Sequence, residues 1–132
     1  MAFFQDLPIE GNDDPINFHS EEVEITLSNP ERISTWIKST IEKEGRIIGD
    51  LNFIFCSDPY LHKINVEYLN HDTYTDVITF PFSSKPSVIN GEIYISIDRI
   101  RENAMTYNVP FEQELTRVVV HGVLHLCGYG DK

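Results

Sequence analysis

The sequence predicts an α+β fold in which a small mixed four-stranded sheet is packed with about four helices. Two kinds of segment predict it: short ones with alternating apolar residues or clustered β-branched and aromatic residues, typical of strands, and longer ones with apolar residues at helical spacing. These segments roughly alternate along the chain. The length of 132 residues and the hydrophobic fraction of 41% suit one domain. We expect it to span residues 1–132, with a loosely attached N-terminal arm at residues 1–15.

The N-terminal third of the chain is expected to contribute extended segments followed by one helix. Residues 16–19 are a candidate short strand, and residues 23–27 alternate apolar and polar side chains, which favours an extended segment. The helix that follows has a proline at its first position, a cap at Ser28 or Asn29 and an end near Gly45.

The middle of the chain predicts a strand, a helix and a second strand. Residues 51–56 read as a strand that is buried on at least one side. Asp58, which is followed by proline, should begin a helix that continues to Tyr68. The β-branched and aromatic stretch at 75–82 predicts a strand, and Pro81 should end its pairing or place it at an edge of the sheet.

The last third predicts one strand and two helices. Gly91 precedes a strand with isoleucines at every second position up to Ile97. Asp98 is expected to cap a helix that ends near Asn108. A proline two residues later should open the final helix, which runs to about Cys127.

Composition and charge narrow the classes of function. The formal charge of −11 disfavours a sequence-independent nucleic-acid coat protein, but it does not exclude a local basic patch or a metal at a substrate site. The sequence lacks a signal peptide pattern and an apolar run long enough to span a bilayer, so we expect a cytoplasmic protein without a membrane partner. Cys56 and Cys127 lie in apolar segments and are expected to be buried free thiols.

Two histidines in the last predicted helix form a candidate metal site. His121 and His125 are four residues apart, so their side chains leave the same helix face with Cβ atoms about 5–6 Å apart. The helix should end at Gly128, and a chain reversal there can bring Asp131 over the histidine face. Two imidazoles and one carboxylate would give a three-ligand site with an open position for water. The alternatives are packed or capping histidines and a solvent-exposed terminal acid.

Three sequence blocks carry a resemblance to a known family. The segment HGVLHLCGYGD at 121–131, the segment YLNHDTYTDVITFPF at 68–82 and the segment GEIYIS at 91–96 resemble the YbeY family in order and in spacing. The resemblance implies a zinc-dependent endoribonuclease, a hydrolase that acts on single-stranded RNA in maturation of the 3′ end of 16S ribosomal RNA and in ribosome biogenesis. It also implies ribosomal RNA and small-subunit components as partners.

The chain departs from the family pattern in two places. Asp131 stands where the family usually has a histidine ligand, and Leu69 stands where it usually has an arginine. A carboxylate also binds zinc, so the site should persist, although two histidines and a carboxylate suit iron and other divalent metals too. Family members generally continue beyond this point, which leaves truncation after Lys132 and a short chain as alternatives. Candidates to replace the arginine are Arg101, Arg117 and Lys63.

Other residues could complete the site. Asp76 and Thr79 are candidates to line the pocket and orient water, with a turn cap and a strand hydroxyl as the alternative roles. Gly122 occupies the position of the catalytic glutamate in HExxH peptidases, which argues against a peptidase. His71 could enter the pocket, but we do not assign it as a ligand. A second hypothesis is a non-catalytic ribosome-assembly factor with a structural metal. A metal with four protein ligands and no open position would support this hypothesis.

Overall fold

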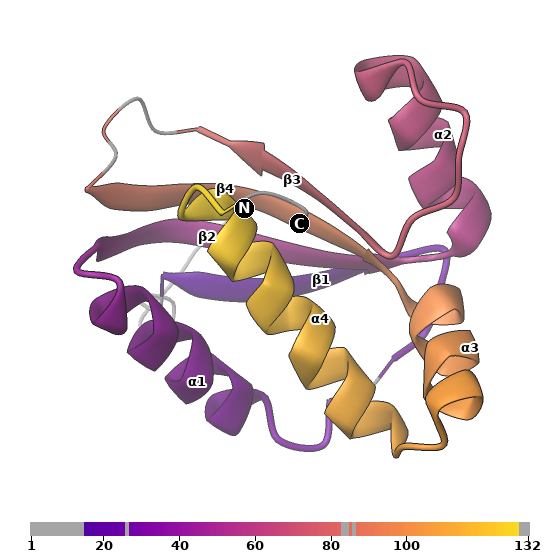
Figure 1. Cartoon of the computed structure of the whole chain (residues 1–132), viewed down its shortest axis with the longest axis horizontal. Coiled ribbons are helices and arrows are strands. Elements are labelled where there is room, and N and C mark those ends of the chain that lie inside the picture. The colour runs from indigo at the N-terminus through magenta and orange to yellow at the C-terminus, as the bar shows by residue number, and fades with distance from the viewer. Residues whose placement is uncertain (1–14, 26, 83–84, 86, 130–132) are drawn as a thin grey trace, which may run out of the picture.

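A computed structural model describes residues 15–25, 27–82, 85 and 87–129 of the chain. These residues form one four-stranded sheet and four helices (Figure 1), which confirms the predicted α+β fold. Residues 1–14 of the expected N-terminal arm lie outside the described residues, as does Asp131. No helix among the described residues is long and apolar enough to cross a membrane.

The sheet is mixed and has the strand order β1-β2-β4-β3. Strands β1 (Ile16–Glu21), β2 (Ile47–Cys56) and β4 (Val88–Ser96) are parallel, whereas β3 (Val77–Pro81) is antiparallel to β4 and forms an edge. Pro81 is the last residue of β3, as expected for a residue that cannot donate a hydrogen bond. At Gly91 a Cβ atom would lie 2.5 Å from the carbonyl oxygen of Phe80, so the close pairing of β3 with β4 requires glycine there.

Helices α1 (Pro30–Lys43) and α4 (Phe111–Leu126) lie against one face of the sheet (Figure 1). Between these helices and the strands is the main apolar core, which removes aliphatic and aromatic side chains of both layers from water. Its fully buried members include Ile37 and Ile41 of α1, Val118, Val119 and Val123 of α4, and Phe53, Phe55, Ile93 and Ile95 of the sheet.

Helix α2 (Asp58–Leu69) packs on the opposite face, and α3 (Ile97–Tyr107) follows β4 at one end of the sheet (Figure 1). The core beneath α2 is small, with Cys56, Leu61 and Ile78 as its buried members. Most of the apolar burial, and with it most of the hydrophobic stabilisation, therefore lies on the α1 and α4 side.

Two details of the predicted elements were wrong. Residues 23–27 do not form a strand in their described part; instead Val23 and Ile25 pack, half-buried, against the main core, which explains their alternation without any pairing. The cap of α3 is Ser96, whose hydroxyl accepts a hydrogen bond from the Arg99 amide, and the helix begins at Ile97. Asp98 accepts a hydrogen bond from the Asp58 amide instead, so its carboxylate ties the first turns of α2 and α3 together.

Candidate metal centre and substrate site

The two histidines of α4 converge near the end of the helix. The Nε2 atoms of His121 and His125 are 3.0 Å apart, the ring centroids are 4.6 Å apart and both side chains are half-buried. The helix ends at Leu126, and Gly128 has a φ of +107°, a conformation that permits the chain to reverse. The predicted convergence of the two imidazoles on the last turns of this helix is therefore present in the structure.

The spacing of the imidazole nitrogens suits a shared divalent ion. Two Zn–N bonds of about 2.0–2.1 Å at a tetrahedral angle place the nitrogens about 3.3 Å apart, close to the 3.0 Å between the Nε2 atoms. The part of the chain that the structure describes holds no group of three His, Cys, Asp or Glu side chains able to bind a metal. Asp131, the predicted third ligand, lies outside that part.

Gly122 fixes the distance between α4 and the sheet. A Cβ atom at this position would lie 2.9 Å from Cγ2 of Ile93 and 3.3 Å from Cγ2 of Val77. The helix backbone therefore rests directly on β3 and β4, with His121 next to the contact. A side chain at position 122 would point into the core, so the structure gives the physical reason why this helix does not carry the HExxH glutamate.

Asp76 and Thr79 lie on the strand that α4 contacts. Asp76 immediately precedes β3, and its carbonyl oxygen accepts a hydrogen bond from the Ser96 amide, 3.0 Å away. Its carboxylate oxygen is 3.8 Å from Nη2 of Arg117 on α4. Thr79 is half-buried and is two residues beyond Val77, so by strand alternation it shares the α4 side of β3. The packing of β3 against α4 thus brings both candidates to the helix that carries the histidines.

A buried carboxylate on α4 was not anticipated from the sequence. Glu114 is only 2% exposed, and its two oxygens accept hydrogen bonds from Nε and Nη2 of Arg117 at 3.0 and 2.6 Å. The hydrogen bonds and charge of Arg117 hold the pKa of Glu114 below its usual value, against the opposing effect of burial. The sequence feature that could have indicated this pair is the spacing of three residues between a glutamate and an arginine in a predicted helix.

The loop before Asp76 is anchored from α2. The buried Asn65 donates a hydrogen bond to the carbonyl oxygen of Thr73 at 2.8 Å and accepts one at its own carbonyl from the His71 amide at 3.1 Å. The His71 side chain is exposed, so we retain it as a non-ligand. Leu69, where the resemblance implies an arginine, is 39% exposed at the end of α2.

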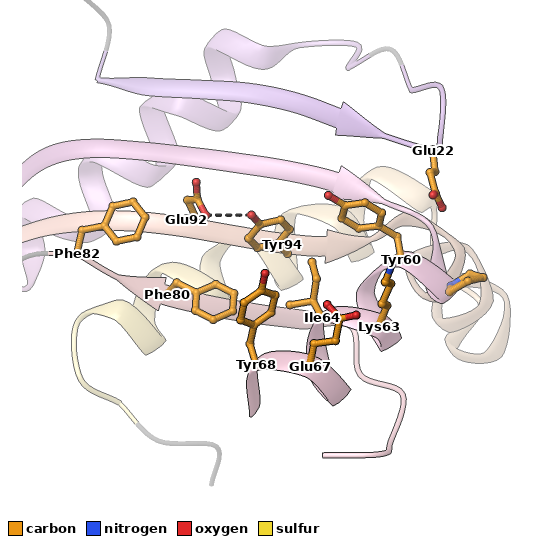
Figure 2. Close-up of a pocket in the computed structure, with 11 residues that line it drawn as sticks. Glu22, Tyr60, Lys63, Ile64, Glu67, Tyr68, Phe80, Phe82, Glu92 and Tyr94 are labelled. Atoms are coloured by element: carbon orange, nitrogen blue, oxygen red, sulfur yellow. Dashed lines mark hydrogen bonds between the residues drawn. The ribbon is translucent and has the colours of Figure 1, made fainter. Parts of the chain in front are cut away.

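A second concave region, which we call the aromatic groove, lies on the α2 face of the sheet (Figure 2). It has a volume of about 630 Å³, and the sequence did not predict it. Figure 2 shows rings of α2, β3 and β4 facing one another, with Phe80 in edge contacts to both Tyr68 and Tyr94. Burial and the hydrogen bond to Glu92 raise the pKa of Tyr94. The charged side chains in its lining are Glu22, Glu67, Glu92 and Lys63.

Comparison with known proteins assigns the sequence to one family. The family model described as "Endoribonuclease YbeY" matches residues 15–132, which include all three sequence blocks. This chain belongs to the YbeY endoribonuclease family. The family assignment predicted from the three blocks is therefore confirmed. An endoribonuclease is a hydrolase of RNA, as expected from the sequence.

Curated relatives are similar in sequence over nearly all of the chain. YbeY endoribonucleases from Christiangramia forsetii and Flavobacterium johnsoniae are each 50% identical over 117 residues, which is 89% of this chain and 80% and 83% of theirs. The solution structure of a Thermotoga maritima protein superposes with a TM-score of 0.60 at 31% identity, covering 89% of this chain and 75% of that one.

Proposed function

We propose that this YbeY family member is a zinc-dependent endoribonuclease that hydrolyses single-stranded RNA at the face of the sheet covered by α4. The observation that supports this most is the convergence of the His121 and His125 Nε2 atoms to 3.0 Å beside β3. As a single hydrolase domain of residues 1–132, it would act in the cytoplasm on the 3′ end of 16S ribosomal RNA, with small-subunit components as partners.

The metal would be held by His121, His125 and Asp131. When bound, a divalent ion supplies Lewis-acid chemistry, which acidifies water and offsets the charge of a phosphodiester. Zinc fits the nitrogen spacing and the donor set of two imidazoles and one carboxylate. The helix ends in a hydrogen-bonded turn, in which the Gly128 amide donates to the His125 carbonyl oxygen at 2.9 Å, and in the proposed site the chain after this turn would carry Asp131 to the histidines.

The remaining site residues would position water and substrate. The Asp76 carboxylate can accept a hydrogen bond from water, because its separation of 3.8 Å from Nη2 of Arg117 is longer than a hydrogen bond. Thr79 offers a hydroxyl on the same side of β3. We assign both the role of orienting water at the reacting phosphate, with a proton accepted by Asp76.

A second candidate function is a non-catalytic ribosome-assembly factor in which the metal only ties the end of α4 to the tail. Two observations favour it: the formal charge of −11 and Leu69 at the position of the family arginine. It requires a closed four-ligand shell, whereas the hydrolase requires a coordination position open to water.

The test is metal content and RNA cleavage measured on the same samples. We expect about one zinc per chain in the wild-type protein, with loss of both zinc and cleavage in His121→Ala, His125→Ala and Asp131→Ala. His19→Ala is the matched control, because His19 is exposed on β1 and hydrogen-bonds Asn52. Zinc without cleavage in the wild type would favour the assembly factor, and zinc retained in Asp131→Ala would remove that residue from the site.

A further inference from the structure

Arg117 presents a fixed positive charge beside the histidine pair. It lies four residues before His121 on α4, so the two side chains leave the same helix face about one turn apart. Its side chain is 51% exposed although a buried carboxylate holds one edge of the guanidinium. An exposed arginine whose orientation is already set loses little side-chain entropy when it binds a ligand.

The hydrogen bonds leave one edge of the guanidinium available. Nε and Nη2 donate to the two oxygens of Glu114, and Asn103 donates to the same carboxylate at 3.4 Å. Among the described residues, no acceptor is hydrogen-bonded to Nη1, and the nearest other carboxylate, that of Asp76, is 3.8 Å from Nη2. The edge formed by Nη1 and Nη2 can therefore receive a second oxyanion.

The other cations that could replace the family arginine lie elsewhere. Arg101 is on α3, where its guanidinium carbon lies 5.9 Å from the centre of the Phe111 ring. Lys63 lines the aromatic groove together with three glutamates (Figure 2). Neither is on the helix that carries the histidines, so Arg117 is the one of the three with the right placement.

We propose that Arg117 binds a non-bridging phosphate oxygen of the RNA linkage that lies at the histidine pair, and that Glu114 is its positioning residue. This inference rests on the proposed function, since it takes RNA as the ligand. A guanidinium is suited to this role because its planar fork matches a phosphate in a bidentate contact. Glu114, nearly fully buried and tied to Asn103, keeps the fork from turning toward bulk solvent.

The experiment is equilibrium binding of a fluorescent, cleavage-resistant 2′-O-methyl oligoribonucleotide to the purified protein over a series of salt concentrations. Arg117→Met should weaken binding by about tenfold at low salt. It should also reduce the slope of log K against log salt by about 0.7, the value for one phosphate contact on a single strand. Arg117→Lys should keep the slope, because it keeps the charge. Arg101→Met is the matched control, with the same change in charge at an exposed site on α3, where the guanidinium lies over Phe111 at the start of α4, at the other end of the helix from the histidines.

Arg117→Met leaves the buried Glu114 without its arginine, so the fold of this variant is checked by thermal unfolding. The comparison is then repeated in the Glu114→Gln background, between the single variant and the double variant that also carries Arg117→Met. The inference is overturned if the salt slope changes no more in the two proteins that carry Arg117→Met than it does in Arg101→Met. Failure of the proposed function is seen separately. If the wild-type protein cleaves no RNA but Arg117→Met still lowers the salt slope, the hydrolase proposal is wrong and the phosphate contact stands.

Discussion

The two faces of the central sheet differ in how they present polar groups. On the α4 face, two imidazoles and one arginine stand beside a large aliphatic core, on a helix that rests directly on the strands. The Glu114 and Asp76 carboxylates on this face lie next to the arginine. On the α2 face, aromatic rings line an open groove with three carboxylates and one ammonium group in its lining (Figure 2). We expect the second arrangement to repel a phosphodiester, and our proposal places it at the first, where a bound divalent ion would add positive charge.

The comparison also shows where rigidity is needed. His121 and Arg117 are on a helix whose distance from the sheet is set by the missing side chain of Gly122, whereas exposed rings such as Phe82, with 63% exposure, border the groove. A hydrolytic site requires fixed distances between its groups, and the α4 face provides them.

The largest expected effect is that of Gly122→Val. The added side chain would collide with Ile93 and Val77, push α4 away from the sheet and destabilise the fold by about 3 kcal/mol. Chemical denaturation measures the loss, and Gln113→Val, an exposed position on the same helix, controls for the helix propensity of valine. Equal stability of the two variants would show that α4 does not rest on the strands as closely as described.

A smaller effect is expected from acid. The folded protein holds the pKa of Glu114 below its ordinary value of 4.5, so ionised Glu114 stabilises the fold at pH values above that ordinary value. This stabilisation is lost as the pH falls through the lowered pKa, because the unfolded chain binds the proton first. Glu114→Gln removes the dependence, so urea unfolding at a series of acidic pH values should show a shallower decline than in the wild type. Parallel declines would contradict the pairing of Glu114 with Arg117.

The smallest effect is expected in the aromatic groove. Phe82→Ser removes a largely exposed ring, so unfolding free energy should change by no more than about 0.5 kcal/mol. RNA cleavage should also stay unchanged, since the groove lies on the other face of the sheet from α4. Cleavage assays against the wild type check this, and a marked loss of rate would place substrate on the α2 face.

Most elements of the fold could be predicted because their apolar periodicity and proline positions are local. The end of β3 at Pro81 and the start of α1 at Pro30 follow from the proline ring itself. The cap of α3 could not be predicted, because Ser96 and Asp98 are both good caps and the choice depends on Asp58, which is distant in the sequence. The alternation at 23–27 misled for another reason: apolar residues that pack against the core without strand pairing give the same pattern as a strand.

The candidate site was predictable only where it is local. His121 and His125 are one helical turn apart, so their convergence follows from the sequence. The approach of Asp76 to Arg117 depends on a strand and a helix that the fold brings together, and no local spacing encodes it. The aromatic groove was missed because its rings come from α2, β3 and β4, each of which reads as an ordinary amphipathic element.

The placement of RNA on the α4 face is tested most directly by NMR. Isotope-labelled protein would be titrated with the cleavage-resistant single-stranded oligoribonucleotide while its amide signals are followed. We expect the largest shifts in the last two turns of α4 and at Asp76–Thr79, with the signals of α2 unchanged. Shifts concentrated on α2 and Tyr94, with α4 unchanged, would place the RNA in the aromatic groove and contradict the proposed site.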